Sequence, residues 1–285
     1  MVNRLMLPDF VWSSELPTPY QKLAWHTFFE QRGRGLSFYS HFPWAKEVSL
    51  GTWSATLWQG QELVAGLVVR DLSGGFEFQN PGLRTAVIGL VCVAEPHRGK
   101  GISSFLLDTT LEHLQALRFD SVTLWTNKPA VYANHGFTTE DRSLFGIVRR
   151  EQCALTEDVL PFSATVKSWP DGAEFSSQLR GLPPFSNHAW RLEAADGSAS
   201  AVVLLDSIGL ALAEWSGQPV RVAELLLQTM PANWRINALR GDSLLNTLKT
   251  VGFTLELEQQ HLQMWANLSG RTQEGRPDFR VLDRI

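Results

Sequence analysis

The stretch of sequence that decides the fold is Val91-Cys92-Val93-Ala94-Glu95-Pro96-His97-Arg98-Gly99-Lys100-Gly101-Ile102-Ser103. It passes from an apolar run rich in valine into a turn with two glycines, and a leucine-rich run with helical spacing follows directly. This order predicts a strand, a tight turn and an amphipathic helix in immediate succession. Glycine is favoured in such a turn because it adopts positive φ angles and lets the main chain approach a ligand closely.

The turn has the chemistry of an anion-binding site. The first N–H groups of a helix have no partner within the helix, and the helix dipole makes this end positive. Arg98 and Lys100 add cations on either side of Gly99. We therefore expect the turn to hold a phosphate or pyrophosphate. Taken alone, however, two glycines also fit a plain strand-to-helix turn whose cations are solvated.

Two other phosphate-binding motifs fit this turn less well. A Walker loop needs Gly-Lys followed by Ser or Thr, whereas Gly101 follows Lys100 here. A dinucleotide fingerprint needs three spaced glycines in a parallel βαβ unit, and this turn has Gly99 and Gly101 alone. The residues therefore indicate an anion site of another kind.

Predicted strands and helices alternate on both sides of the turn. The leucines of the helix that follows it fall on one half of the helical wheel, so one face should lie on a sheet. The elements expected in the first half are a helix over 20–30, strands over 52–58, 62–71 and 84–94, a helix over 102–117, a strand over 121–126, a short helix over 129–134 and a final strand over 143–149. This alternation predicts an α/β domain.

The second half repeats this order in outline. Its expected elements are strands over 190–194, 199–206 and 209–215, a helix over 220–230, a strand over 234–239, a helix over 243–251 and strand-like residues over 256–268. A Gly-Phe pair follows a helix in each half, at Gly136 and at Gly252. We expect two related lobes, residues 1–155 and 156–285, although many unrelated α/β domains also alternate strand and helix.

Composition excludes several classes of protein. The chain has 285 residues and a net charge of −4, which argues against a general nucleic-acid binder or a protein that binds anionic membranes. No apolar run approaches the roughly 20 residues of a membrane span, and the first residues do not resemble a secretion signal. Cys92 and Cys153 form no disulfide framework or metal cluster. We expect a cytoplasmic, reduced protein without a bound metal.

Two motifs resemble the GNAT superfamily of acyl-CoA N-acyltransferases. The first is Val93-x-x-Pro96-x-Arg98-Gly99-Lys100-Gly101-Ile102 with the leucine-rich helix, and the second is Tyr132-x-x-x-Gly136-Phe137. The family pattern Arg/Gln-x-x-Gly-x-Gly/Ala corresponds to Arg98-x-x-Gly101-x-Ser103, with serine in the last position. Pro96 lies one place later than the usual proline, and the connection from Asn127 to Tyr132 is shorter than is common. The resemblance covers residues 52–149, and the second lobe follows the family in order alone.

The resemblance implies where acetyl-CoA binds. It implies a mixed sheet in which the strands that end near Val93 and Thr126 splay apart. In this family the pantetheine arm pairs with the first of these strands as an added strand. One N–H of that strand would face the thioester carbonyl and stabilise the oxyanion. The expected cofactor-binding residues are Val91, Cys92, Val93, Arg98, Gly99, Lys100, Gly101, Ile102, Ser103 and Asn127.

The resemblance also implies that Tyr132 is the catalytic acid. Its phenol would donate a proton to the thiolate that leaves as the C–S bond breaks. The alternatives are that Tyr132 is a half-buried aromatic covering the sheet, that Asn127 is an ordinary turn residue, and that Cys92 is a small buried hydrophobe. No general base is assigned, because a titratable side chain is more often a solvated surface residue. The residues considered for that role are His26, His41, Glu62, Glu77, Glu95 and His97.

The second lobe lacks both motifs. Residues 216–221 contain a single glycine, and Leu248 occupies the position that corresponds to Tyr132. We expect this lobe not to bind acyl-CoA; packing against the first lobe, completion of the acceptor site and formation of a homodimer remain open as its role.

The leading hypothesis is an N-acetyltransferase that transfers the acetyl group of acetyl-CoA to a primary amine of a small molecule or peptide. In this family the amine attacks directly within a ternary complex, so catalysis comes largely from positioning. Aromatic residues between Phe38 and Trp58 favour an apolar or aromatic acceptor. The alternatives are a non-catalytic acyl-CoA sensor or scaffold and a protein that binds another phosphorylated ligand.

Overall fold

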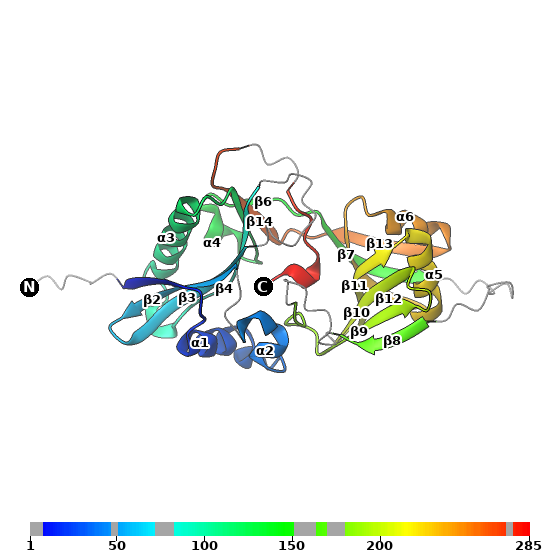
Figure 1. Ribbon diagram of the computed structural model, residues 1–285, viewed down its shortest axis with the longest axis horizontal. Coiled ribbons are helices and arrows are strands. Elements are labelled where there is room, and N and C mark those ends of the chain that lie inside the picture. The colour runs from blue at the N-terminus through cyan, green and yellow to red at the C-terminus, as the bar shows by residue number, and fades with distance from the viewer. Residues whose placement is uncertain (1–7, 47–50, 72–82, 151–163, 170–179, 272–275) are drawn as a thin grey trace, which may run out of the picture. The chain divides into compact units, whose positions relative to one another are not determined.

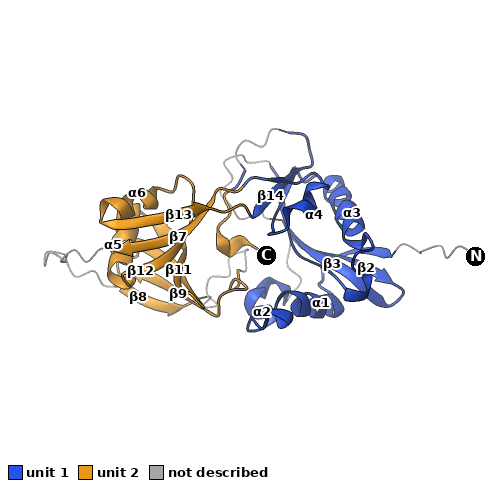
Figure 2. Cartoon of the chain, turned by 180° about the vertical axis from the view of Figure 1, so that it is seen from behind, with its two compact units in different colours: residues 1–140, 262–277, 285 blue, residues 141–261, 278–284 orange. Residues whose placement is uncertain are grey.

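The chain forms two compact units, shown in different colours in Figure 2. The computed structural model describes residues 8–46, 51–71, 83–150, 164–169, 180–271 and 276–285. Unit 1 comprises Met1–Glu140, Leu262–Pro277 and Ile285, and unit 2 comprises Asp141–His261 and Asp278–Arg284. Each unit has its own seven-stranded mixed sheet, as expected for an α/β chain of two related lobes.

The sheet of unit 1 has the order β1-β2-β3-β4-β5-β14-β6. Its strands are β1 (Asp9–Ser13), β2 (Thr52–Gln59), β3 (Glu62–Asp71), β4 (Thr85–Val93), β5 (Ser121–Trp125), β6 (Thr138–Thr139) and β14 (Gln263–Asn267). The neighbours β4 and β5 are parallel and all other neighbours are antiparallel. The predicted strands of residues 52–126 are confirmed, while β1 was not expected from the sequence.

Helices pack on both faces of this sheet (Figure 1). They are α1 (Thr18–Phe28), α2 (Phe38–His41), α3 (Ile102–Ala116) and α4 (Pro129–Ala133), with short 3-10 helices over Glu30–Arg32, Pro43–Ala45 and Glu95–His97. On α3, Leu106, Leu107 and Leu114 are fully buried in the core on one face. Each such side chain contributes roughly 1.5–3 kcal/mol by leaving water, so the predicted apolar face holds α3 on the sheet.

The sheet of unit 2 has the order β13-β7-β12-β11-β10-β9-β8. Its strands are β7 (Ser143–Arg150), β8 (Ala164–Ser168), β9 (His188–Ala194), β10 (Ala199–Asp206), β11 (Gly209–Gly217), β12 (Asn233–Leu239) and β13 (Phe253–Gln259), with helices α5 (Pro219–Thr229), α6 (Ser243–Thr250) and the 3-10 helix η4 (Val281–Asp283). The parallel pair is β11–β12, which corresponds to β4–β5 of unit 1. The shared strand order and the shared parallel pair relate the two folds.

Each sheet contains one strand from the other half of the chain. β7 follows β6 in the sequence, yet it pairs with β12 and β13 of unit 2. Conversely, β14 pairs with β5 and β6 of unit 1. The units therefore are not successive stretches of the chain. The sequence could predict β7 and β14 as strands, because strand preference is local, but it could not predict which strands they pair with. The expected boundary between residues 155 and 156, like Cys153, lies outside the described residues.

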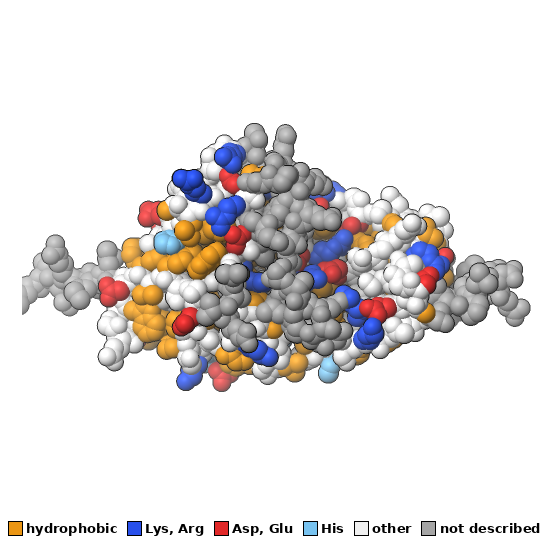
Figure 3. Space-filling model, in the orientation of Figure 1, with side chains coloured by type: hydrophobic (Ala, Val, Ile, Leu, Met, Phe, Trp, Pro, Cys, Tyr) orange, Lys and Arg blue, Asp and Glu red, His pale blue; other side chains and the backbone are white. Residues whose placement is uncertain are grey.

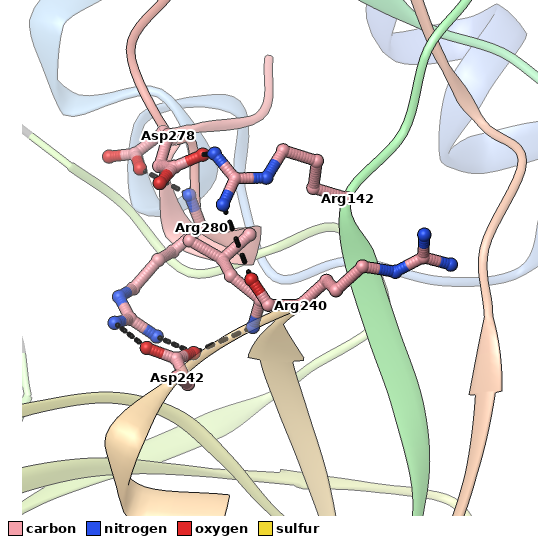
Figure 4. Close-up of polar contacts among 7 residues, drawn as sticks. Arg142, Arg240, Asp242, Asp278 and Arg280 are labelled. Carbon is pink, nitrogen blue, oxygen red and sulfur yellow. Dashed lines mark hydrogen bonds and ion pairs between the residues drawn. The ribbon is translucent and has the colours of Figure 1, made fainter.

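Two ion pairs connect residues 278–280, which lead into η4, to other elements of unit 2 (Figure 4). Arg280 pairs with Asp242 at 3.2 Å, and its guanidinium lies 3.9 Å from the ring centroid of Trp215. Arg142 pairs with Asp278 at 2.8 Å and also donates to the main-chain oxygen of Arg240. The apolar side chains of η4 are buried against β10 and β11. These contacts make η4 part of the fold of unit 2.

Asp283 makes the stability of the chain depend on pH. Burial raises the pKa of its carboxyl to about 6 from 3.8, although Arg180 lies 3.4 Å away and opposes the shift. The unfolded chain therefore ionises this group at lower pH than the folded chain does. Stability should fall by about 3 kcal/mol as the pH rises from about 4 to about 7. Urea unfolding of the wild type and of Asp283→Asn should show this decrease in the wild type alone, and parallel pH profiles would contradict it.

None of the described helices is long and apolar enough to cross a membrane.

Candidate functional site

β4 carries a bulge near its C-terminal end. Val68 pairs with Gly89 and Gly66 pairs with Cys92, so that Leu67 of β3 faces two residues of β4, Leu90 and Val91. Leu90 has a φ of 51°, a left-handed conformation that is unusual for leucine. A bulge of this kind changes the direction of the main-chain groups that follow it. The residues that follow here are the predicted cofactor-binding residues Cys92 and Val93.

The strands β4 and β5 part just before this bulge. Their parallel pairing runs from Thr85–Ser121 to Val87–Thr123 and ends there. β4 continues to Val93 without a strand partner on that side among the described residues. The arrangement agrees with the splay that the resemblance implies, and it leaves main-chain N–H and C=O groups for another extended molecule.

The turn after β4 leaves the N-terminus of α3 uncapped. Gly99 and Gly101 have φ angles of 73° and 75°, and a Cβ atom added at either would meet nothing within 4 Å. Gly101 is the N-cap residue, and no side chain caps the helix. The first N–H groups of this 15-residue helix, at Ile102 and Ser103, therefore lack a side-chain partner at an exposed turn.

Cations lie around this turn. Arg98 and Lys100 are exposed, and the Nε of Arg98 donates to the main-chain oxygen of Val93 at 3.0 Å. This bond holds the arginine side chain beside the end of β4. Figure 3 shows Lys and Arg side chains gathered in the area where Figure 1 places α3 and α4. The positive helix end and these side chains together favour an anion.

Cys92 is a buried thiol. Its side chain is 3% exposed, and burial raises its pKa to about 12, which keeps it protonated. A protonated, buried thiol is a poor nucleophile, so the small-hydrophobe interpretation fits this residue. Val91 and Val93 are half-buried at the edge of the core. These three residues therefore offer a ligand their main chain rather than their side chains.

Tyr132 lies on α4 at the rim of the core. Its ring is half-buried and makes an edge contact with Phe137, with 6.0 Å between centroids. Burial raises the pKa of the Tyr132 phenol above its usual value, so the group carries its proton at neutral pH. Asn127 is exposed in the turn that follows β5. A protonated phenol is the form that an acid catalyst requires.

A contact that the sequence did not predict ties α4 to α3. The Nδ1 of His135 lies 2.6 Å from Oδ1 of Asp108, and the His135 side chain is 7% exposed. The main-chain N–H of His135 also donates to the main-chain oxygen of Tyr132 at 2.9 Å. The pair thus fixes the end of the short helix that carries Tyr132. The spacing of these two residues gives no signal of their contact, since it depends on how α3 and α4 pack.

Four of the residues considered as a general base, His26, His41, Glu62 and His97, have polar partners within the protein. His97 lies 3.3 Å from Glu62, and His26 lies 2.7 Å from Glu30 at the surface. His41 is buried and accepts a hydrogen bond from the main-chain N–H of Leu36. The remaining two are Glu95, which is exposed, and Glu77, which lies outside the described residues. The structure therefore gives no reason to single out one of them.

The corresponding turn of unit 2 is built differently. A Cβ atom at Gly217 would come within 2.3 Å of the main-chain oxygen of Ser198, so this turn is packed against the chain. Helix α5 starts at Pro219, which has no N–H to offer. In its first turn Arg221 pairs with Asp196 at 2.9 Å. In the described residues of unit 2, the turn that corresponds to the two-glycine turn of unit 1 is therefore closed.

A family model identifies the first of these folds. Residues 18–137 match the acetyltransferase (GNAT) family. Over these residues, which are fewer than half of the chain, the sequence is similar to that family. The match includes α1, the strands β2 to β5, the two-glycine turn and the helix of Tyr132. The family that this stretch is similar to consists of acetyltransferases. No curated protein matches the sequence significantly.

Solved structures extend the likeness to both units. A protein of unknown function from Enterococcus faecalis, described as a probable N-acyltransferase, has 14% identity and a TM-score of 0.60, over 92% of this chain and 73% of that one. A GCN5-related N-acetyltransferase from Anabaena variabilis has 14% identity and a TM-score of 0.59, over 91% of this chain and 73% of that one. A tandem GNAT protein from the clavulanic acid biosynthesis pathway has 10% identity and a TM-score of 0.50, over 93% of this chain and 100% of that one. At these identities the likeness establishes the fold, which is that of two GNAT-like lobes.

Proposed function

We propose that the chain is an N-acetyltransferase that moves the acetyl group of acetyl-CoA to a primary amine of a small molecule or peptide. The observation that supports this most is the open two-glycine turn at the start of α3, next to the parted strands β4 and β5. The diphosphate of the cofactor binds the N–H groups of residues 99–103, with Arg98 and Lys100 as counter-charges. The pantetheine arm lies along residues 91–93, within reach of Asn127.

The reaction needs no covalent enzyme intermediate. The amine nitrogen attacks the thioester carbon, and the carbonyl electrons move to the oxygen, which accepts a hydrogen bond from a main-chain N–H of β4. The carbonyl then re-forms as the C–S bond breaks, and the leaving thiolate takes the proton of Tyr132. The nitrogen releases one proton to solvent, and Tyr132 regains one from solvent. Holding both substrates in one complex supplies much of the rate.

Unit 2 binds no acyl-CoA in this proposal. Its closed turn and Leu248 in place of the tyrosine leave it without an anion site or an acid. Packing, a contribution to the acceptor site and a homodimer surface remain the roles open to it. Of the aromatic residues on α2 and near Pro43–Ala45, Phe38, Phe42 and Trp44 are buried in unit 1, so the proposal of an apolar or aromatic amine rests here on Tyr39, which is 40% exposed.

Calorimetric titration should give one equivalent of bound CoA per chain. ADP should bind more weakly, because it offers the diphosphate without the pantetheine arm, and NAD should not compete. Release of free thiol from acetyl-CoA should then depend on the amine in a panel of alkyl, aryl and peptide amines. Tight binding with no amine-dependent thiol would instead favour the sensor, and stronger binding of ADP or NAD than of CoA would favour another phosphorylated ligand.

A further inference from the structure

A tyrosine from α1 reaches the bulge of β4. Tyr20 is fully buried, and its hydroxyl donates to the main-chain oxygen of Leu90 at 3.0 Å. Leu90 is the residue with the left-handed φ of 51°. The hydrogen bond therefore holds the main chain of the bulge at Leu90, the residue with the unusual conformation.

The surroundings of Tyr20 keep its ring in one position. A Cβ atom on Gly66 would lie 2.5 Å from the ring, so the close packing depends on a glycine in β3. Gly66 pairs with Cys92, the residue that ends the bulge. Burial raises the pKa of Tyr20 well above its usual value, so the hydroxyl stays a donor. The ring thus connects α1, β3 and the bulge through packing and one buried hydrogen bond.

The bulge decides which way the following N–H groups point. Successive main-chain N–H groups of a strand alternate between its two edges, and one inserted residue reverses the alternation beyond it. Without the bulge, the N–H groups at residues 91–93 that face the parted side toward β5 would face β3 instead. Leucine is disfavoured in the left-handed region, so the bulge needs an interaction that holds it there.

We propose that Tyr20 is a positioning residue of the transferase site. By holding the main-chain oxygen of Leu90, it keeps the bulge in the form that aims N–H groups of residues 91–93 at the acetyl thioester. This inference rests on the proposed function. The diphosphate turn at residues 99–103 does not depend on Tyr20, so its loss affects turnover rather than cofactor binding.

The test compares Tyr20→Phe with Thr110→Val in the full chain. The control also removes a buried hydroxyl that donates to a main-chain oxygen, that of Leu106 at 2.7 Å on α3. We expect kcat to fall about tenfold for Tyr20→Phe, a barrier change of about 1.4 kcal/mol, with the KM for acetyl-CoA within about twofold. Ala94 lies just beyond the bulge, and its main-chain N–H donates to the main-chain oxygen of Val64 at 2.9 Å. Hydrogen exchange of this amide should become about tenfold faster in Tyr20→Phe alone.

Leu90→Gly supplies a second variant, because glycine adopts the left-handed φ without strain. In that background Tyr20→Phe should lower kcat by less than about threefold, since the bulge no longer needs to be held. An equal loss in both backgrounds would show a merely structural role and overturn the inference. If Tyr20→Phe alone does not fold, kcat of Leu90→Gly is compared with kcat of the double variant, and a loss of about tenfold or more there overturns the inference.

Failure of the inference and failure of the proposed function give different results. An unchanged kcat and unchanged hydrogen exchange in Tyr20→Phe, with an active wild type, overturn the role of Tyr20 and leave the transferase intact. A wild type that transfers nothing to any amine overturns the proposed function and the catalytic part of the inference together. Hydrogen exchange then still decides whether Tyr20 holds the bulge.

Discussion

Gly101→Leu is expected to lower the affinity for acetyl-CoA by at least about a hundredfold while the chain stays folded. Gly101 has a positive φ, and a Cβ atom there would meet nothing in the protein, so the side chain would occupy the space in front of the α3 N-terminus. The diphosphate needs that space. Losing two charge-assisted hydrogen bonds to main-chain N–H groups costs about 3 kcal/mol or more, which is a hundredfold or greater change.

Gly60→Leu is the matched control. Gly60 joins β2 to β3, has a φ of 61° and also has nothing within 4 Å of an added Cβ atom. Leucine at position 60 therefore introduces a similar backbone strain, in a turn where no ligand is expected. Calorimetry with CoA should separate the two variants, whereas thermal unfolding should show similar losses. Equal CoA affinity in Gly101→Leu and the wild type would remove the diphosphate site from this turn.

The second large effect is expected for Tyr132→Phe, with kcat lower by about a hundredfold because a general acid is lost. The KM for acetyl-CoA should stay within about twofold, since phenylalanine keeps the edge contact with Phe137. Stopped-flow or steady-state thiol release under saturating amine measures the change. Phe137→Leu, which alters the same contact but leaves the phenol, is the control, and an equal loss of kcat there would indicate packing rather than proton transfer.

The pH profile gives an independent measure of the same role. Burial raises the pKa of Tyr132 above the usual 10.0, so the protonated acid persists to higher pH than for a solvated tyrosine. Turnover should therefore not decline below about pH 10 because of this group. Any decline at lower pH belongs to another group and should persist in Tyr132→Phe. A decline near neutral pH that disappears in the variant would contradict the assigned acid.

Local sequence signals predicted the elements that position the site. The valine run, the two glycines and the leucine spacing predicted β4, the turn and α3, because strand, turn and helix preferences are local properties. The open geometry at Gly99 and Gly101 follows from the same preferences. The family motifs added the parting of β4 and β5, which no local pattern specifies.

Features that depend on distant residues were not predictable in this way. The contact of Tyr20 with Leu90 joins residues that are 70 positions apart, and the contact of His135 with Asp108 depends on packing of two helices. The strand over 143–149 was expected to finish the first lobe, but the structure places β7 in the sheet of unit 2. Its sequence suits either sheet, and long-range hydrogen bonding makes the choice.

The exchange of β7 and β14 has a consequence for how the polypeptide is made. β14 lies between β5 and β6, so the first sheet stays incomplete until the ribosome has synthesised residue 267. A fragment that stops after the first half would lack β14 and expose the edges of β5 and β6, which favours aggregation. Completion of the sheet that carries the candidate site is therefore coupled to synthesis of residues far beyond the first half of this sequence.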